Sequence, residues 1–492
     1  MASPRHYVAF DLGAESGRVL LGTLENQTLS LEEIHRFPNG PVLVNNSMRW
    51  DILRIYDELK VGLKKIVGRK ISIESISCDS WGVDYVLLKG TEPMLGVPYH
   101  YRDARTDMGF EHAFKLMPAD QIFGETGIQF MTLNTLYQLH ADLREQPEKL
   151  RSADLFLNIG DYINYLFSGV RKCDESLAST TQCYDPRTRS WSTVIIDRFG
   201  FPQHVFPEVV KSGTLLGPIL PAVGKESGFQ NVQVITGCSH DTGAAVAAVP
   251  AEGTGWAYLS SGTWSLLGVE RSTPIIDDKS RYYNFTNEIG YGGSIRFLKN
   301  LIGLWLVQEC RREWAREGKN YTYEELTAMA EQAEPLHSLI DPSDARFLKP
   351  ECMTKAIEEF CRESSQPVPS QPGEYIRCAL ESLALLYRTT LEQLEDTTKE
   401  KISTLHIVGG GSKNTLLNQF AANASGRTVI AGPVECTGIG NVVVQAMTLG
   451  HIGTHREARE IVKKSFPLIT YHPENPGVWH EAYKRFQEMR RA

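Results

Sequence analysis

Two stretches of the chain alternate apolar and small polar residues according to the same plan. The first is YVAFDLGAESGRVLLGTL at residues 7–24, and the second is WAYLSSGTWSLLGVE at residues 256–270. Each predicts a β-hairpin, because two apolar runs joined by a turn of glycine, serine and threonine are typical of paired strands. Each is followed later by an amphipathic helix and a short strand. The second half of the chain is therefore predicted to repeat the α/β plan of the first.

Apolar residues at helical spacing mark the helices of this repeated plan. The helix at 52–67 carries on one face Leu53, Tyr56, Leu59, Leu63 and Ile66. The later helix is marked by Ile376, Leu380, Leu383, Tyr387, Leu391 and Leu394. The strands that follow are expected at 73–76, before CDSWGVD, and at 404–408, before GGGSKN.

The chain is too long for one hydrophobic core, since it has 492 residues. We expect two α/β domains of like fold, 1–249 and 250–492, which face each other across a cleft, with the boundary near Pro250. A last amphipathic helix is expected at 478–489, where Trp479, Tyr483, Phe486 and Met489 recur at helical intervals. We expect this helix to dock back onto the first domain.

The segment VITGCSHDTGAAVAAV at 234–249 is the strongest candidate for chemistry. It predicts a short strand, a turn at Gly237 and a helix that begins near Asp241. A carboxylate in the first turn of a helix lies near the positive end of the helix dipole, so Asp241 should be charged at neutral pH and able to accept a proton. Asp241 is therefore the candidate general base. The alternative is that Asp241 only caps the helix.

The neighbours of Asp241 do not form a hydrolytic or metal site. Ser239, His240 and Asp241 are adjacent, whereas members of a catalytic triad come from separate segments. Cys238 and His240 have no second pair at a spacing suited to zinc. We expect His240 to hydrogen-bond a polar substrate.

Two further segments carry the aromatic and amide groups that sugar pockets use. These are WGVD at 81–84 and Lys299-Asn300. Trp81 and Trp305 are equally well explained as core residues.

Backbone N–H groups in turns of small residues can bind phosphate oxygens. Two such turns, 13–17 and 260–263, would clamp a triphosphate if they faced each other. Asp11 would hold Mg²⁺ directly or through water, and Arg18 would either neutralise phosphate or pair with a carboxylate. The glycines at 409–411 would let a flat base pack on bare backbone, although a simple tight turn remains the alternative. Gly438-Ile439-Gly440-Asn441 lacks a leading strand and a third glycine, so we discount a dinucleotide site there.

Composition narrows the class of protein. Apolar residues make up 42% and charged residues 22% of the chain, as in soluble globular proteins, and the net charge of −8 does not favour nucleic acid. The sequence has neither a long apolar run that would span a membrane nor an N-terminal signal peptide. Nine cysteines without CxxC pairs indicate a reducing cytoplasm. A small-molecule substrate is expected, and no obligate protein partner is evident.

The motifs DLGAESGR, GCSHDTGAA, YLSSGTWS and IVGGGSKN together resemble the FGGY family of carbohydrate kinases, within the actin, sugar kinase and chaperone superfamily. The resemblance spans essentially the whole chain and implies two ribonuclease H-like domains, ATP as co-substrate and Mg²⁺. The residues implied to contact ATP are Ala14, Glu15, Ser16, Gly17, Arg18, Thr263, Gln308 and Gly410. Those implied to line the sugar site are Gly82, His240, Asp241, Thr242 and Asn300, with Asp241 as the proton acceptor.

Further segments resemble the family members that act on L-rhamnulose. They are HRFPNG, RWD, WGVD, YRDARTD, LNTLYQL, FTNE and LKNLIGLWLVQE. This resemblance implies ATP-dependent phosphorylation of L-rhamnulose at the 1-hydroxyl, in rhamnose catabolism. Another ketose, L-fuculose or D-xylulose, remains an alternative. An actin-like or chaperone-like ATPase is a second alternative, although a chaperone of this superfamily would need a further peptide-binding domain.

Overall fold

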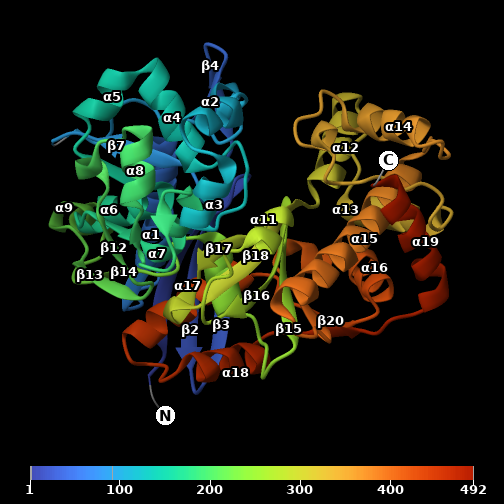
Figure 1. The fold of residues 1–492 in the computed structure, drawn as a ribbon. Helices are drawn as coiled ribbons and strands as arrows, with labels where there is room; N and C mark the ends of the chain where they lie inside the picture. Colours follow the sequence, from blue (N-terminus) through green and yellow to red (C-terminus); the bar gives the residue numbers. More distant parts are fainter. Residues whose placement is uncertain (1–2, 91, 491–492) are drawn as a thin grey trace. The chain divides into compact units, whose positions relative to one another are not determined.

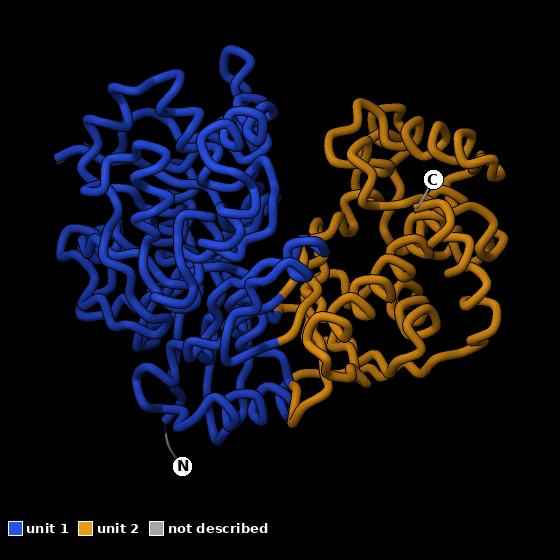
Figure 2. The backbone as a smooth tube through the Cα atoms, in the orientation of Figure 1, with its two compact units in different colours: residues 1–250, 270–297, 436–465 blue, residues 251–269, 298–435, 466–492 orange. Residues whose placement is uncertain are grey.

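A computed structural model describes residues 3–90 and 92–490. The chain forms two compact units, each assembled from several segments (Figure 2). Unit 1 comprises residues 1–250, 270–297 and 436–465, and unit 2 comprises 251–269, 298–435 and 466–492. The chain leaves unit 1 after Pro250, near the expected boundary, but two later segments return to unit 1. The compact units are therefore not continuous in the sequence, and the two domains 1–249 and 250–492 stay a prediction.

Unit 1 is built on a six-stranded sheet (Figure 1). The order of its strands is β13 (Thr214–Pro218), β14 (Gln233–Thr236), β6 (Ser75–Ser80), β1 (Arg5–Leu12), β2 (Ser16–Glu25) and β3 (Thr28–Pro38). The first hairpin is confirmed, with β1 and β2 antiparallel and Leu12 opposite Gly17. Strands β1, β6 and β14 are parallel. Their carboxyl ends therefore share one edge of the sheet, which is where ligands bind in α/β folds.

The predicted helix at 52–67 is α1 (Ile52–Val67), and it packs its apolar face into the core of unit 1. The buried face includes Ile52, Ile55, Leu59, Leu63 and Ile66. Leu53 was wrongly assigned to this face, because its exposed fraction is 54%. Successive helical residues are rotated by about 100°, so the residue next to Ile52 already turns toward solvent.

The remaining elements of unit 1 surround this sheet. Its short strand pairs are β4 (Pro41–Val44) with β5 (Ser47–Trp50), β7 (Tyr85–Leu88) with β8 (Leu155–Asn158), β9 (Lys172–Asp174) with β12 (Glu208–Val210), and β10 (Tyr184–Asp185) with β11 (Ser190–Trp191). Its other helices are α2 (Gly109–Leu116), α3 (Ala119–Thr126), α4 (Thr135–Glu145), α5 (Pro147–Ser152), α6 (Ile159–Ser168), α7 (Glu175–Ala178), α8 (Thr193–Phe199), α9 (Pro221–Ser227), α10 (Asp241–Ala247), α11 (Asp278–Tyr282), α17 (Cys436–Thr448) and α18 (His455–Ser465).

The second large sheet repeats the plan of the first. Its order is β17 (Thr286–Ile289), β18 (Ile295–Ile302), β16 (Trp264–Arg271), β15 (Trp256–Ser261), β19 (Thr404–Val408), β20 (Thr428–Ala431) and β21 (Ile469–Tyr471). The hairpin of β15 and β16 is antiparallel, and β15, β19 and β20 are parallel, as are β1, β6 and β14 in the first sheet. The repeated plan predicted from the sequence is confirmed.

Unit 2 adds a layer of helices to this plan. They are α12 (Trp305–Arg316), α13 (Tyr323–Gln332), α14 (Met353–Glu363), α15 (Pro372–Thr398), α16 (Thr415–Ser425) and α19 (Pro476–Met489). The last helix does not dock on the first domain as expected. It packs on α15 and α16 of unit 2, where the Tyr483 hydroxyl donates to Glu392 and Gln487 donates to Thr389. Among the described helices, none is long and apolar enough to cross a membrane.

Helix α17 explains why a late segment of the chain belongs to unit 1. A Cβ added to Gly440 would lie 1.8 Å from the carbonyl oxygen of Ala244 in α10, and one added to Gly438 would lie 2.3 Å from Leu20 Cδ1. Only glycine permits such close approach of two elements. The segment 438–441 is therefore part of a packed helix, which agrees with its dismissal as a dinucleotide site.

Candidate active site

The candidate catalytic turn, residues 237–240, joins β14 to α10 and is held by buried hydrogen bonds from a neighbouring segment. The Ser239 backbone N–H donates to Asp174 Oδ1 at 3.1 Å, and the His240 N–H donates to Ser176 Oγ at 3.0 Å. Asp174 is fully buried, and this burial raises the pKa of its carboxyl to about 6. These two hydrogen bonds fix the backbone of the turn at Ser239 and His240, directly before Asp241.

Asp241 is the first residue of α10, and its side chain is 32% exposed. Its Oδ1 accepts hydrogen bonds from the Thr242 backbone N–H and hydroxyl. Burial raises the pKa of the Asp241 carboxyl to about 7, and the negative charge of Asp11 adds to this effect. Burial thus acts on this carboxyl against the helix dipole, which favours the charged form. A pKa near the working pH suits a general base.

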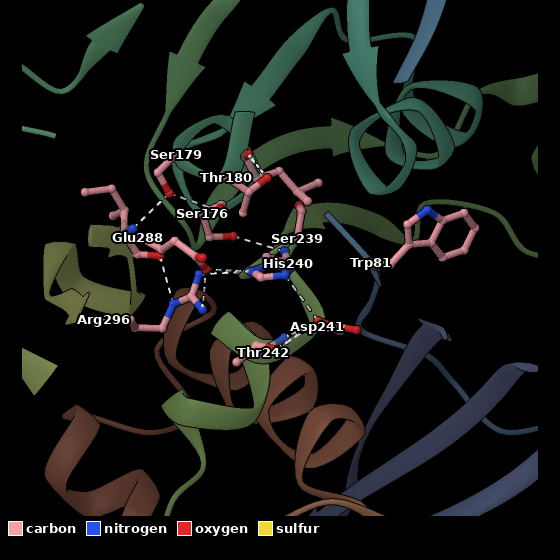
Figure 3. Close-up of polar contacts among 12 residues, drawn as sticks. Trp81, Ser176, Ser179, Thr180, Ser239, His240, Asp241, Thr242, Glu288 and Arg296 are labelled. Carbon is pink, nitrogen blue, oxygen red and sulfur yellow. Dashed lines mark hydrogen bonds and ion pairs between the residues drawn. The ribbon is translucent and has the colours of Figure 1, made fainter. Parts of the chain in front are cut away.

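His240 lies between Asp241 and a buried ion pair (Figure 3). Arg296 is fully buried, and its Nη1 lies 3.1 Å from Glu288 Oε2. Arg296 Nη2 lies 3.0 Å from His240 Nδ1, while His240 Nε2 lies 3.4 Å from Asp241 Oδ1. Burial, and then the charge of Arg296, holds the pKa of His240 well below its usual range. The imidazole is therefore neutral at physiological pH.

Two further carboxylates lie at the ends of β1 and β6. Asp11 and Asp79 are opposite each other in the parallel pair and are buried. Asp11 forms an ion pair with Arg18, and Asp79 Oδ2 accepts from Asn441 Nδ2 at 2.6 Å. Burial, and then the charge of Asp11, raises the pKa of Asp79 well above its usual range. Arg18 therefore pairs with a buried carboxylate, Asp11, which was one of the two roles considered for it from the sequence.

The carboxylates of Asp11 and Asp79, at the ends of β1 and β6, are of the kind that binds a hard cation such as Mg²⁺. Mg²⁺ prefers oxygen ligands and keeps several waters, so one or two carboxylates suffice to hold it. Asp11 supplies such oxygens, and Asp79 Oδ1 is buried with no hydrogen-bond partner in the described chain. Within residues 3–90 and 92–490, no group of three or more His, Cys, Asp or Glu side chains is placed to hold a metal. An ion here would therefore rely on water and phosphate for most of its ligands.

The first phosphate-type turn connects β1 to β2 and contains Ala14 and Glu15, followed by Ser16 and Gly17 at the start of β2. The Gly13 N–H donates to Ser16 O at 3.0 Å, so this N–H closes the turn itself. Asn39 braces the loop by donating from its side chain to Gly13 O and from its backbone to Glu15 O. The turn is thus a preformed loop of small residues beside Asp11.

The ATP-contact residues expected in unit 2 lie near the ends of its strands and on α12. Thr263 is in the β15–β16 turn, and its carbonyl accepts from the N–H groups of Gly303 and Trp305. Gln308 is on α12, and its Oε1 is buried without a hydrogen-bond partner among the described residues. Gly410 follows β19, and no described atom lies within 4 Å of a Cβ added there. An open glycine and an unsatisfied amide oxygen are features that a ligand can use.

The segment WGVD at 81–84, proposed from the sequence as part of a sugar pocket, contains both core residues and a strained backbone position. The Trp81 ring centroid lies 4.0 Å from that of Trp50, and both indole N–H groups donate to the fully buried Asp84. Trp81 is therefore a core residue. Gly82 leaves room for Thr180, whose Oγ1 would be 3.0 Å from an added Cβ. Val83 has φ of 69°, a strained value for a β-branched residue that is typical of functional loops.

The other sugar-side candidates are placed as follows. Asn300 lies on β18 in unit 2, and Thr242 is a buried residue of α10. Trp305 donates its indole N–H to Phe347 O, so it packs within unit 2.

Sequence reasoning missed four residues around the catalytic turn: Asp79, Glu288, Arg296 and Asn441. A sequence signal existed for Arg296, because an arginine inside the apolar strand sequence IRFLK needs a buried partner. Glu288 in TNEI is the matching acid on β17. Asn441 gave no such signal, because its contact with Asp79 joins segments that are far apart in the sequence.

Comparison with known proteins places this geometry in a family. Residues 6–248 match the model of the N-terminal domain of the FGGY family of carbohydrate kinases, and residues 257–449 match that of the C-terminal domain. The chain is 43% identical to a rhamnulokinase of Bacteroides thetaiotaomicron, over 98% of this chain and 99% of the relative. It is 36% identical to a rhamnulokinase of Bacillus subtilis, over 95% of this chain and 96% of the relative.

Solved structures share the fold at much lower identity. A gluconate kinase of Lactobacillus acidophilus superposes with a TM-score of 0.81 at 16% identity, covering 99% of this chain and 98% of that one. A glycerol kinase of Plasmodium falciparum with ADP superposes with a TM-score of 0.79 at 14% identity, with the same coverage. With two matched domain models that together span most of the chain, this protein belongs to the FGGY family of carbohydrate kinases.

Proposed function

We propose that this enzyme transfers the γ-phosphoryl group of ATP to the 1-hydroxyl of L-rhamnulose, giving L-rhamnulose 1-phosphate and ADP in rhamnose catabolism. The observation that carries the proposal is the identity of 36–43% over nearly the full length to relatives that are rhamnulokinases. The structural neighbour that contains ADP supports ATP as the co-substrate. The nine cysteines, free in the described chain, suit a reducing cytoplasm.

Asp241 is the proposed general base. Its carboxylate would take the proton of the 1-hydroxyl as that oxygen bonds to the γ-phosphorus and the bond from phosphorus to the ADP oxygen breaks. Its partial exposure leaves Oδ2 accessible to substrate, while Thr242 holds Oδ1. His240 Nε2 would donate a hydrogen bond to a sugar oxygen. Gly82, Thr242 and Asn300 are proposed to complete the sugar site.

The nucleotide is proposed to bind through backbone N–H groups of the two hairpin turns, with its adenosine at Gly410 and Gln308. Asp11 would hold Mg²⁺ directly or through water, and the bound ion would supply positive charge beside the phosphates. Arg18 is already paired with Asp11, so it would fix that carboxylate and place its own charge near the phosphates. In this proposal the phosphates bind without a loop rich in lysine or arginine.

A panel of sugars tests the assignment. ADP release is measured with L-rhamnulose, L-fuculose, D-xylulose, gluconate and glycerol, and the phosphate position in the product is read from phosphorus–proton coupling. L-Rhamnulose should have the highest kcat/KM, with the phosphate on C1. A preference of about tenfold for another sugar, equal to about 1.4 kcal/mol, would overturn the substrate while leaving the kinase class intact. ATP hydrolysis without added sugar, and without a phosphorylated product, would instead favour an ATPase.

A further inference from the structure

The buried Arg296 makes two hydrogen bonds and one ion pair with its guanidinium. Nε donates to the carbonyl of Ile289 at 3.2 Å, Nη1 faces Glu288 at 3.1 Å, and Nη2 faces His240 Nδ1 at 3.0 Å. Gly290 makes room for this side chain, because an added Cβ would lie 3.1 Å from Arg296 Cγ. Burying a charged guanidinium without partners would cost much free energy, so these contacts hold the fully buried Arg296 side chain in one position.

The contact with His240 determines where the imidazole proton is. Arginine has only N–H donors and keeps its charge in proteins, so it cannot accept a hydrogen bond from Nδ1. His240 Nδ1 must therefore be the acceptor, which places the ring proton on Nε2. Nε2 in turn lies 3.4 Å from Asp241 Oδ1. The opposite tautomer would direct Nδ1–H at Arg296 Nη2, which is 3.0 Å away and carries only protons, whereas the carboxylate of Glu288 is farther from Nδ1, at 3.5 Å.

The surroundings of the ring favour the same arrangement. The charged groups that face His240 are Arg296 from β18, Glu288 from β17 and Asp241 from its own helix. On the side of α7, Ser176 Oγ accepts from the His240 backbone N–H and leaves the ring unaltered. Glu288 balances the charge of Arg296, and Arg296 Nη2, at 3.0 Å, is closer to His240 Nδ1 than Glu288 Oε2 is, at 3.5 Å.

We propose that Arg296 is a positioning residue, which fixes the proton of His240 on Nε2 and directs that N–H toward Asp241 and the sugar oxygen beside it. The ring is then a permanent donor that does not compete with Asp241 for the hydroxyl proton. It also selects, next to the base, a substrate atom that can accept a hydrogen bond. This role in catalysis rests on the proposed sugar kinase reaction, whereas the position of the proton belongs to the free enzyme.

Nitrogen NMR of the free protein tests the proposal directly. With ¹⁵N-labelled histidine, the His240 signals are assigned by their loss in His240→Gln. The wild-type ring should show an unprotonated Nδ1 and a protonated Nε2 throughout the range of about pH 5.5–8. A protonated Nδ1 in the wild type would overturn the proposal, whether or not any variant folds.

The variant Glu288→Gln/Arg296→Met removes both members of the ion pair, so no buried charge is left unpaired. His240 should then populate both tautomers, and its pKa should rise, although burial still holds it below the ordinary value. kcat/KM for the sugar should fall about tenfold at pH 7.5. An unchanged Nε2–H signal in this variant would contradict the role of Arg296. Arg296→Lys provides a second variant, because one ammonium cannot reproduce the fork that serves both partners.

Unit 2 offers a matched control for the loss of a buried ion pair. Arg377 Nε lies 2.8 Å from Glu381 Oε1, and both side chains are buried. Arg377→Met/Glu381→Gln should lower stability without changing the His240 signals. The two proposals can fail separately. If L-rhamnulose does not react, the NMR result can still show that Arg296 fixes the proton on Nε2. If the tautomer does not change in the double variant, the assignment of L-rhamnulose as the substrate is unaffected.

Discussion

The two large sheets share one strand plan but carry different chemistry at the carboxyl ends of their parallel strands. In the first sheet, Asp11 of β1 lies opposite Asp79 of β6. In the second sheet, Ser260 of β15 lies opposite Val408 of β19. The same backbone thus presents a pair of carboxylates in one sheet and a hydroxyl beside an apolar residue in the other. Under the proposed function, the first sheet would supply the proton and cation chemistry and the second would contribute to nucleotide binding.

Glycine is also used differently in the two places. Gly440 in unit 1 allows α17 to pack against α10, and an added Cβ would meet the Ala244 carbonyl at 1.8 Å. Gly410 in unit 2 faces open space, with no described atom within 4 Å of an added Cβ. The first glycine is needed by the protein's own packing. The second is not required by packing, which leaves room there for the proposed nucleotide.

The largest effect is expected for the substitution of Asp241, the first residue of α10. Asp241→Asn keeps the size and most hydrogen bonds of the side chain but cannot accept the hydroxyl proton. Steady-state kinetics should show kcat reduced by roughly 10²- to 10⁴-fold, with little change in sugar binding. A folded variant that keeps more than about a third of wild-type kcat, a barrier change of ~0.7 kcal/mol, would remove Asp241 from the mechanism.

A thermal melt provides the control for this variant. The folded-state pKa of Asp241 is raised to about 7, so the folded protein binds more protons than the unfolded chain between the ordinary carboxyl range and pH 7. Stability therefore falls as pH rises through that window. Asparagine removes this penalty, so the melting temperature at pH 8 should not be below that of the wild type. A large drop would indicate a structural role instead.

The next effect concerns the packed glycine. Gly440→Ala should force α17 and α10 apart and cost about 1–3 kcal/mol of unfolding free energy, as overpacking does. kcat should also fall, because α10 begins at Asp241. Urea unfolding measures the first effect. Gly477→Ala is the control, since no described atom lies within 4 Å of an added Cβ at that position of α19; equal midpoints for the two variants would contradict this account.

Much of the fold was predictable because hydrophobic periodicity is a local signal. The two hairpins, helix α1 and strand β19 lie where the sequence pattern placed them. The position of Leu53 was wrong, because a one-residue error in helical phase moves a side chain from core to solvent. The docking of α19 was wrong as well, since an apolar stripe shows that a helix packs but not which surface it packs on.

The candidate site was less predictable because its contacts are long-range. Asp241 and His240 could be found from one short motif. Arg296 reaches His240 across 56 positions, and Asn441 reaches Asp79 across 362. No local pattern encodes such pairs. The first arises because residues 270–297 belong to unit 1, and the second because residues 436–465 return to unit 1 and bring α17 against β1 and β6.

A moderate effect is expected at the open glycine of unit 2. Gly410→Leu should fill the space where the adenosine is proposed to pack and raise KM for ATP about tenfold, equal to about 1.4 kcal/mol, with KM for the sugar nearly unchanged. Gly477→Leu adds the same side chain elsewhere in unit 2 and should leave both constants unaltered. If only the sugar KM moved, the nucleotide would have to bind elsewhere.

The smallest effect tests the electrostatics of Asp241 itself. As the proposed base, Asp241 would act as the carboxylate, so kcat/KM should decline as pH falls below about 7, the value to which burial raises its pKa. The Thr242 hydroxyl donates to Oδ1 at 3.1 Å and stabilises the charged form. Thr242→Val keeps the shape but loses this donor, so the acidic limb of the pH profile should move to higher pH by up to about one unit. Thr242→Ser keeps the hydroxyl and should leave the limb in place. A limb that moved to lower pH in Thr242→Val, or was equally displaced in both variants, would show that another group controls the profile.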